Sequence, residues 1–456
     1  MHPYKQSFYL SLVAGCARAA LDIIPGATWT ATNTGEHIQA HGAGLIEENG
    51  IYYLIGEEKT AGTLFQAINC YSSPNLIEWT FVNQLLTVTS NEGDDLGPNR
   101  IVERPKVLYN DGTGQYVMWM HIDDTDYADA RTGVAVGDNG VCGEYVYQGS
   151  FRPLGFQSRD IGLYKDEDRV GYLLSEDREY GTRIIKLTDD YLDVEEVTFG
   201  WEYFAESPAL VKRGENYFIF GSHLTGWNPN DNIYSTATSL SGPWTNWTEF
   251  APVGTNTYSS QVSYVLPLGT DQAIYMGDRW VSNNLATSTY IWLPLEIDGT
   301  SVSLNWYDAW TLDVAAGTWT ERGDVSSYEG EDATLLGGAQ TIECSRCSGG
   351  IAAGYIGGDD DGAVVFEIDV DAQTASDWVT LDVKYLNGDT DPRYAAVSVN
   401  GGGAQTVAFI STNSHPESTG SSAVHVSLVE GVNTIEVSGV GDGGWGPDVD
   451  QLVVPA

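Results

Sequence analysis

A recurring pattern of hydrophobic and polar positions organises the first two thirds of the chain. Its clearest copy spans residues 205–223, A-E-S-P-A-L-V-K-R-G-E-N-Y-F-I-F-G-S-H, where a carboxylate and a proline precede two apolar runs joined by a polar turn. Short apolar runs bounded by turn residues are typical of β-strands. Four similar stretches begin near residues 41, 103, 160 and 261. Each stretch therefore predicts two strands joined by a tight turn.

The spacing of the copies predicts how the strands are arranged. Measured between the polar residues at their starts, the spacings are 62, 57, 46 and 55 residues. That length accommodates a four-stranded blade with its loops, so five copies predict a five-bladed β-propeller over residues 26–322. The first strands of all blades surround the central axis, so their polar starts are expected to face one pit. These starts are His41, Glu103, Asp160, Glu206 and Gln261. Polar residues are also common at strand starts by default, and that is the alternative interpretation.

The C-terminal part of the chain has a different sequence pattern. Residues 326–456 contain short alternating strands such as V-V-F-E-I-D-V and A-A-V-S-V-N-G. Such strands predict a second domain, a β-sandwich of the jelly-roll kind. No long segment has helical periodicity, so the predicted class is all-β throughout.

The charge balance excludes two classes of partner. The chain has 21 basic and 63 acidic residues and a formal net charge of −42. This charge argues against binding to nucleic acid or to an anionic membrane. It fits a soluble secreted protein, although solubility alone also accounts for it. We expect a monomer, because nothing in the sequence indicates otherwise.

Residues 1–20 resemble a secretory signal peptide. Lys5 precedes an apolar stretch that is too short to span a bilayer, and Ala17-Arg18-Ala19 matches a small-residue cleavage site. Cys16 would leave with this segment, so four cysteines remain, as expected in an oxidising compartment. Cys344 and Cys347 predict a local disulfide. Cys70 and Cys142 are candidates for a second one, which the sequence alone cannot assign.

Carboxylates that face one pit suit the hydrolysis of glycosidic bonds. An inverting glycosidase needs one acid to protonate the leaving oxygen and a second group, about 6.5–9.5 Å away, to activate water. Opposite walls of a propeller pit provide such a separation. Tyr127, Trp227 and Trp280 could stack on a sugar ring, although a single aromatic residue more often serves packing than ligand contact.

Several motifs together resemble glycoside hydrolase family 43, and within it the exo-β-1,3-galactanases of fungi and bacteria. The motifs are Q-A-H-G-A-G, V-E-R-P-K-V, S-R-D, E-S-P-A, G-S-H-L-T-G-W, Y-S-S-Q and I-Y-M-G-D-R-W. The resemblance implies a five-bladed propeller, secretion, and release of galactose, with inversion, from the non-reducing end of β-1,3-galactan, the main chain of arabinogalactan. It implies no cofactor for catalysis.

The resemblance also assigns roles to residues. Glu206 matches the general acid, Glu103 an essential carboxylate of the subgroup, and Asp160 the residue that tunes the pKa of the acid and contacts substrate. Further sugar contacts are implied at Glu57, Arg104, Tyr127, Thr225 and Trp227.

The general base is where the chain departs from most of family 43. Most members carry an aspartate on the first blade, where this chain has Gln39-Ala40-His41, and the galactanase subgroup instead has a glutamine at the position of Gln261. Gln261 could orient the water, for example as an imidic-acid tautomer, or Glu103 could help. In the alternative interpretation, Gln261 is only a hydrogen-bond partner of the sugar.

From Y-E-G-E-D-A onward the chain resembles a family-35 carbohydrate-binding module. This resemblance implies a structural calcium ion bound by Glu329, Glu331 and Asp450, although solvated acidic residues are the alternative. The candidates for sugar binding in the module are Tyr355, Asn387, Asp389, Arg393 and Trp445.

Two rival functions remain at this point. An α-L-arabinofuranosidase or β-xylosidase of the same family would normally have the first-blade aspartate. A non-catalytic galactan-binding lectin would bind the polysaccharide and release nothing.

Overall fold

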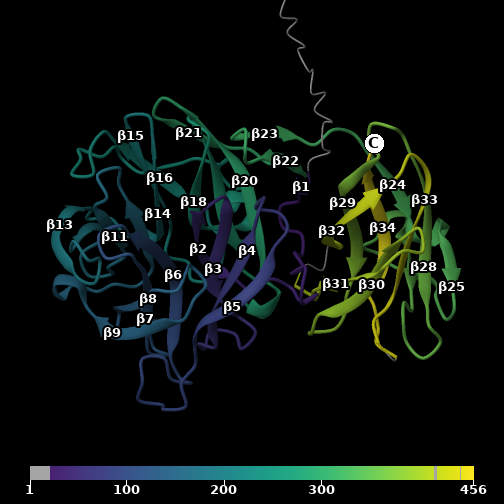
Figure 1. Ribbon diagram of the computed structural model, residues 1–456, viewed down its shortest axis with the longest axis horizontal. Coiled ribbons are helices and arrows are strands. Elements are labelled where there is room, and N and C mark those ends of the chain that lie inside the picture. The colour runs from purple at the N-terminus through teal and green to yellow at the C-terminus, as the bar shows by residue number, and fades with distance from the viewer. Residues whose placement is uncertain (1–20, 415–417, 442) are drawn as a thin grey trace, which may run out of the picture.

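Strands dominate the structure, a computed structural model that describes residues 21–414, 418–441 and 443–456 (Figure 1). The predicted all-β class is therefore confirmed. The predicted signal peptide, residues 1–20, lies outside the described residues. Within the described part of the chain, no helix is long and apolar enough to cross a membrane.

Five four-stranded antiparallel sheets follow one another along the chain, and in each sheet the strands pair in chain order. The first two sheets comprise β2 (His41–Glu48), β3 (Ile51–Glu57), β4 (Ala67–Ser73) and β5 (Thr80–Thr87), then β6 (Ile101–Asn110), β7 (Gln115–Asp123), β8 (Arg131–Gly137) and β9 (Tyr145–Phe151). The third and fourth comprise β10 (Ile161–Lys165), β11 (Gly171–Ser175), β12 (Arg183–Leu187) and β13 (Val194–Gly200), then β14 (Glu206–Arg213), β15 (Asn216–Ser222), β16 (Ile233–Ala237) and β17 (Thr248–Glu249). The fifth comprises β18 (Gln261–Leu268), β19 (Gln272–Arg279), β20 (Thr289–Asp298) and β21 (Ser301–Leu304).

The five sheets form a ring around their first strands. Each first strand contacts the first strand of the next sheet, and β18 contacts β2, which closes the ring. Apolar side chains fill the spaces between neighbouring sheets, as Met118 and Ile68 do between the first and second. The hydrophobic repeats found in the sequence therefore correspond to one sheet each.

The first described segment of the chain ties this ring to the C-terminal sheets. Strand β1 (Asp22–Ile23) pairs with β22 (Trp310–Asp313), which pairs with β23 (Thr318–Glu321). The Asp22 backbone N–H donates to Thr380 Oγ1 at 2.9 Å, and the Thr28 N–H donates to the Ser421 carbonyl at 2.8 Å. The two parts thus share backbone hydrogen bonds as well as surface contacts.

Two antiparallel sheets pack over one apolar core in the C-terminal part, as in a β-sandwich. One sheet has the order β26 (Gln340–Glu343), β27 (Ile351–Gly354), β34 (Asp448–Pro455), β29 (Ser376–Leu386), β32 (Gly420–Leu428), with β24 (Val325–Glu329) also paired to β34. The other has the order β25 (Thr334–Leu336), β28 (Ala363–Val370), β33 (Gly431–Gly439), β30 (Arg393–Val399), β31 (Gln405–Phe409). Short helical turns occur at α1 (Asn256–Ser259), η1 (Pro153–Gly155), η2 (Leu285–Thr287), η3 (Gly330–Asp332) and η4 (Ser348–Gly350).

Both candidate cysteine pairs form disulfides. Cys344 and Cys347 are bonded, which confirms the predicted local disulfide. Cys70 is bonded to Cys142, which links β4 of the first sheet to the loop after β8 of the second. This second pairing, which the sequence left open, depends on the two sheets being neighbours in the ring.

Candidate active site

A pit of about 160 Å³ lies where the first strands meet. It brings together most of the predicted site residues, and its walls also include Arg178, Gly226 and Trp280. The predicted residues in its walls are Glu57, Glu103, Arg104, Tyr127, Asp160, Glu206, Trp227 and Gln261.

Irregular backbone at the strand starts brings these side chains into the pit. The pairing of β6 shifts register after Glu103, and that of β14 shifts after Glu206. In both strands the next residue, Arg104 or Ser207, has a positive φ, 55° and 57° respectively. Consecutive residues of a regular strand point to opposite faces, and such bulges re-aim side chains. The bulge in β6 therefore allows Glu103 and Arg104 both to face the pit.

Gln261 is also preceded by irregular backbone, in this case a left-handed turn. The four residues of α1 have φ values between 50° and 58°, and none of them is glycine. Such residues are unfavourable in this conformation unless the surroundings hold them. Here the Asp231 carboxylate accepts the Asn256 N–H at 2.7 Å, and Thr257 Oγ1 accepts the Asn232 N–H at 2.7 Å. These bonds fix the backbone that leads into β18 and therefore the position of the Gln261 side chain.

Glu206 lies in surroundings that keep it protonated. Burial and the nearby carboxylates Asp160 and Glu176 raise the pKa of Glu206 to about 9, although Arg104 and Arg178 oppose this. Its Oε1 accepts a hydrogen bond from Gln261 Nε2 at 3.0 Å, and its Oε2 accepts one from Arg178 Nη2 at 3.2 Å. A carboxylic acid that holds its proton at neutral pH suits a general acid.

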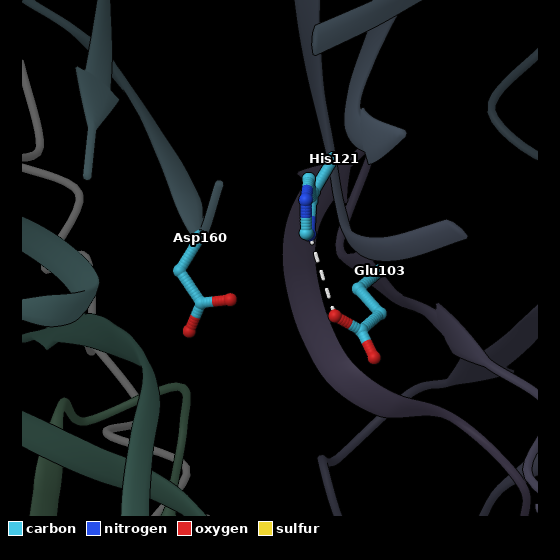
Figure 2. A group of neighbouring side chains, drawn as sticks. All are labelled: Glu103, His121 and Asp160. Carbon is cyan, nitrogen blue, oxygen red and sulfur yellow. Dashed lines mark ion pairs between the residues drawn. The ribbon is translucent and has the colours of Figure 1, made fainter. Parts of the chain in front are cut away.

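Glu103 is surrounded by positive charge instead. Burial alone would raise its pKa, but Lys59 and His121 lower the pKa of Glu103 to about 2. Lys59 Nζ lies 3.6 Å from its Oε1, and His121 Nδ1 lies 3.3 Å from its Oε2, the ion pair drawn in Figure 2. Hydrogen bonds to Asp123 and Glu103 outweigh burial and raise the pKa of His121 to about 9. Glu103 therefore stays ionised, whereas Glu206 stays neutral.

Three of these side chains lie close enough together to be considered as metal ligands. Glu103, His121 and Asp160 place one ligand atom each within 4.8 Å of the others (Figure 2). Lys59 already pairs with Glu103, and Arg104 Nε pairs with Asp160 Oδ2 at 3.1 Å. Since these cations balance the carboxylates, the group fits an ion-pair network better than a metal site.

The Gln261 amide is fully hydrogen-bonded in this arrangement. Its Oε1 accepts hydrogen bonds from Arg104 Nη2 and from Trp280 Nε1, the latter at 2.9 Å. Its Nε2 donates to Glu206 and to Ser222 Oγ. Gln261 is thus held beside Glu206. Hydrogen bonds to an incoming sugar and water would replace some of these bonds.

One expectation about the pit needs correction. His41 does not line it: the side chain is fully buried, hydrogen-bonded to Asp278 Oδ1 at 3.1 Å and stacked on Tyr290. Glu57, which pairs with His41 in the register of β2 and β3, lines the pit. Thr225, predicted to contact the sugar, is exposed and is not among the residues that line the pit; its hydroxyl donates to the Asn228 carbonyl of its own loop.

Sequence reasoning missed four charged residues that set these proton states: Lys59, His121, Glu176 and Arg178. Lys59 and His121 flank Glu103, and Arg178 bridges Glu176 and Glu206, with its Nε 2.6 Å from Glu176 Oε1. None of them starts a first strand. The only signal for them was their position just after, or at the end of, the second strand of a repeat.

The C-terminal module gathers most of its predicted sugar-binding residues on one surface. Tyr355 and Trp445 are 50% and 51% exposed and their ring centroids lie 6.2 Å apart. Arg393 pairs with Asp389 at 2.8 Å and donates to the Gly446 carbonyl beside Trp445. Asn387 differs from the prediction, because it is fully buried and its amide donates to the carbonyls of Asp391 and Phe409. It shapes the loop rather than facing a ligand.

The three predicted calcium ligands are close enough to interact electrostatically. Burial and the neighbouring Glu329 and Glu331 raise the pKa of Asp450 to about 6. Glu329 Oε2 and Glu331 Oε2 are buried and have no hydrogen-bond partner among the described residues. Buried carboxylate oxygens without a partner, near another acid, fit a hard cation such as calcium.

Two parts of the chain match known protein families. Residues 40–265 match glycosyl hydrolases family 43, and residues 368–454 match the CBM13 domain of α-galactosidase, so the family-35 assignment of the module is not confirmed. A comparison with curated proteins found no match.

Solved structures of exo-β-1,3-galactanases are similar to the chain over most of its length. The Phanerochaete chrysosporium enzyme, solved as a variant with β-1,3-galactotriose, is 36% identical and has a TM-score of 0.66, with 95% of this chain and 100% of that one covered. A family-43 β-1,3-galactosidase with galactodeoxynojirimycin is 32% identical and has a TM-score of 0.60, with 64% and 100% covered. The Clostridium thermocellum exo-β-1,3-galactanase, at 24% identity and a TM-score of 0.62, with 89% and 100% covered, shares the fold. The matched residues, the pit and these relatives together show that the chain is a glycosidase and belongs to glycoside hydrolase family 43.

Proposed function

We propose that the protein is a secreted, exo-acting, inverting galactan 1,3-β-galactosidase. It releases galactose from the non-reducing end of β-1,3-galactan, the main chain of arabinogalactan. In this proposal the ring of five sheets is a five-bladed β-propeller, and the C-terminal module binds the same polysaccharide. Two disulfides are consistent with an oxidising compartment and hence with secretion.

The observation that supports this proposal most strongly is the opposite proton state of two carboxylates in one small pit. Glu206 is held neutral and Glu103 is held ionised. Carboxyl groups whose surroundings separate their pKa values in this way divide into acid and base or stabilising roles. The relative bound to β-1,3-galactotriose supplies the substrate class.

The pit also favours action at a chain end. Its volume of about 160 Å³ leaves room for one sugar ring, and its walls come from all five sheets. The terminal galactose would enter the pit, with the glycosidic oxygen beside Glu206. Glu206 would give its proton to that oxygen as the bond to the anomeric carbon breaks, while a water attacks from the opposite face.

Two groups compete for the role of accepting the proton of that water. Glu103 is an ionised carboxylate, the chemically stronger base. Gln261 lies 3.0 Å from the acid and is held by Arg104 and Trp280, which positions it to orient a water but leaves its amide neutral. Substitution of Glu103 and of Gln261, each in turn, distinguishes them by the size of the fall in kcat.

Incubation with linear β-1,3-galactan tests the proposal. We expect galactose as the sole early product, first formed as the α-anomer and detectable by NMR. The matched control is Glu206→Gln, which should keep its affinity for galactotriose and lose turnover. Binding without any product from the unaltered protein would replace the proposal with a galactan-binding lectin. Release of arabinose or xylose instead would assign a different specificity within the family.

A further inference from the structure

Beside the pit, large apolar side chains lie exposed together. We call them the rim aromatic patch, which consists of Tyr180, Tyr203, Phe204 and Leu224. Tyr180 is 62% exposed and Phe204 is 41% exposed, and the other two are also exposed. Exposed apolar side chains that gather in one place mark contact surfaces.

One backbone and one side-chain hydrogen bond join the loops that carry the patch. The Thr182 N–H donates to the Tyr203 carbonyl at 3.0 Å, which joins the loop of Tyr180 to the loop that leads into β14. The Tyr203 hydroxyl is hydrogen-bonded to His223 Nδ1 at 3.1 Å, which joins that loop to the one carrying Leu224. Three loops from the third and fourth sheets, which carry these exposed apolar side chains, are thus bonded to one another.

The aromatic rings of the patch are supported from behind. Tyr203 stacks on Trp247 with ring centroids 5.9 Å apart and an interplanar angle of 26°. Tyr180 packs edge-on against Phe156 at 6.0 Å. A ring that is held on one face and exposed on the other loses little conformational entropy when a ligand covers it.

The patch adjoins the pit on the side of the acid. Arg178, two residues before Tyr180, lines the pit and donates to Glu206 Oε2. Phe204 is two residues before Glu206 itself, and Gly226, two residues after Leu224, lines the pit. The loops that carry the patch therefore lead directly into the pit wall that contains Glu206.

Reaction chemistry determines what lies on that side. A general acid must lie beside the oxygen of the bond being cleaved, because it protonates that oxygen. The leaving part of the substrate is attached to the same oxygen. When the terminal sugar fills the pit, the rest of the polysaccharide must therefore pass over the rim next to Glu206.

We infer that the rim aromatic patch binds the galactan chain on the reducing-end side of the cleaved bond. Ring faces of Tyr180 and Phe204 would cover the apolar faces of the sugars, and the tyrosine hydroxyls would serve their polar edges. The occupant is an uncharged hexose chain, which needs no cation in the patch. This inference rests on the proposed function, because that function defines which sugars lie outside the pit.

Kinetics on a short and a long substrate test the inference with the full-length protein. β-Galactosyl fluoride occupies the pit alone, because its leaving group is a single fluorine atom, whereas β-1,3-galactotetraose also reaches the rim. Tyr180→Ala and Phe204→Ala should lower kcat/KM for the tetraose about five- to tenfold, as expected for truncation of a contact aromatic. They should leave the value for the galactosyl fluoride unchanged. Tyr180→Phe and Phe204→Tyr keep the ring and should retain most activity on both.

Trp306→Ala serves as the matched control. Trp306 is 38% exposed, follows β21 of the fifth sheet and is not part of the pit wall, so its loss should not distinguish the two substrates. An equal loss on both substrates in Tyr180→Ala would overturn the inference, since the ring would then act on the pit. No loss on either substrate would overturn it as well.

Failure of the proposed function gives a different result. The unaltered protein would then release no galactose from the tetraose, and calorimetric titration with tetraose and with galactose would decide the inference. A five- to tenfold loss of tetraose affinity in Tyr180→Ala, with galactose affinity intact, would support the patch as a sugar-binding surface. Unchanged tetraose affinity, or no binding in the unaltered protein, would overturn it.

Discussion

Replacement of Glu176 by glutamine should shift the pH range in which the protein is active. Glu176 is fully buried, pairs with Arg178 at 2.6 Å, and lies with Asp160 and Glu206 in a group whose ligand atoms are within 4.8 Å of one another. Its negative charge is one reason why the pKa of Glu206 is raised, after burial and Asp160. Glu176→Gln removes that charge and keeps the side-chain shape. It also leaves Arg178 paired with Glu206, the other carboxylate within ion-pair distance of it among the described residues.

The expected size of the shift follows from Coulomb's law. Two carboxylates about 4.8 Å apart repel each other by about 3.5 kcal/mol at an effective dielectric constant of about 20. Arg178 lies between them and its side chain is 42% exposed, so guanidinium and solvent screen most of this repulsion. We therefore expect a net effect of about 1 kcal/mol, which corresponds to a fall of somewhat less than one unit in the pKa of Glu206.

The direction of the shift in the pH profile follows from the reaction. Glu206 must be protonated to act as an acid, so activity falls as pH rises through its pKa. A lower pKa therefore moves the alkaline limb of the kcat/KM profile on β-1,3-galactobiose to lower pH, by somewhat less than one unit. The double variant Glu176→Gln/Arg178→Gln removes one charge of each sign and should bring the limb back towards its original position. A 2,4-dinitrophenyl β-galactoside, whose leaving group needs no protonation, should show no such limb.

The reasoning is refuted if Glu176→Gln leaves the alkaline limb in place while its melting temperature matches that of the unaltered protein. A shift to higher pH would refute it as well, because removal of a neighbouring anion cannot raise the pKa of Glu206. A loss of activity that is uniform across pH would indicate that Glu176 acts only by holding the loop after β11.

Three further predictions concern the base, the module and the cation. Glu103→Gln should lower kcat at least about 100-fold if Glu103 accepts the proton of the water, whereas a loss of that size in Gln261→Ala with a mild one in Glu103→Gln would assign this step to Gln261. Trp445→Ala should weaken binding to polymeric galactan several-fold and spare hydrolysis of galactobiose, and unchanged polymer affinity would remove Trp445 from the sugar-binding surface. Chelation should lower the melting temperature of the full-length protein more at pH 7.5 than at pH 4.5. The pKa of Asp450 is raised to about 6, so without a cation stability falls as pH rises from about 4, where an unfolded aspartate ionises, to about 6. Equal shifts at the two pH values would contradict a cation at Asp450.

The repeat pattern predicted most of the residues that start the inner strands. His41, Glu206 and Gln261 are the first residues of β2, β14 and β18, and Asp160 directly precedes β10, whereas Glu103 is the third residue of β6. Strand periodicity and turn residues are local properties, so the sequence reveals them. Which starts face the pit is not local: His41 is buried against Tyr290 of the fifth sheet, and Glu57 of β3 takes its place. The absence of a side chain at Gly42 leaves room for Glu57 to do so, since a Cβ atom there would clash with Glu57 Oε1.

Residues that reach the site from a neighbouring strand were harder to predict, because their contacts are also not local in the sequence. Lys59 follows β3, His121 lies in β7, and Arg178 follows β11, so each reaches its partner only once the sheets are assembled. Asn387 illustrates the reverse error in the module. Its motif suggested a sugar contact, but its amide is used to bond the backbone of its own loop and β31. From the sequence alone, a polar side chain beside a strand end is as consistent with a hydrogen bond to the backbone as with a contact to a ligand.

The pit shows how one residue type acquires two roles in this fold. Glu103 and Glu206 are both glutamates near the start of an inner strand, and both are followed by a residue with positive φ. Their different proton states come from the other strands. Cations reach Glu103 from the ends of β3 and β7, whereas Glu206 is faced by Asp160 before β10 and Glu176 after β11. The inner strands therefore provide the carboxylates, and the side chains around them decide which one donates a proton. A substitution such as Glu176→Gln, which leaves every inner strand unchanged, should for this reason alter the chemistry of the pit without altering its shape.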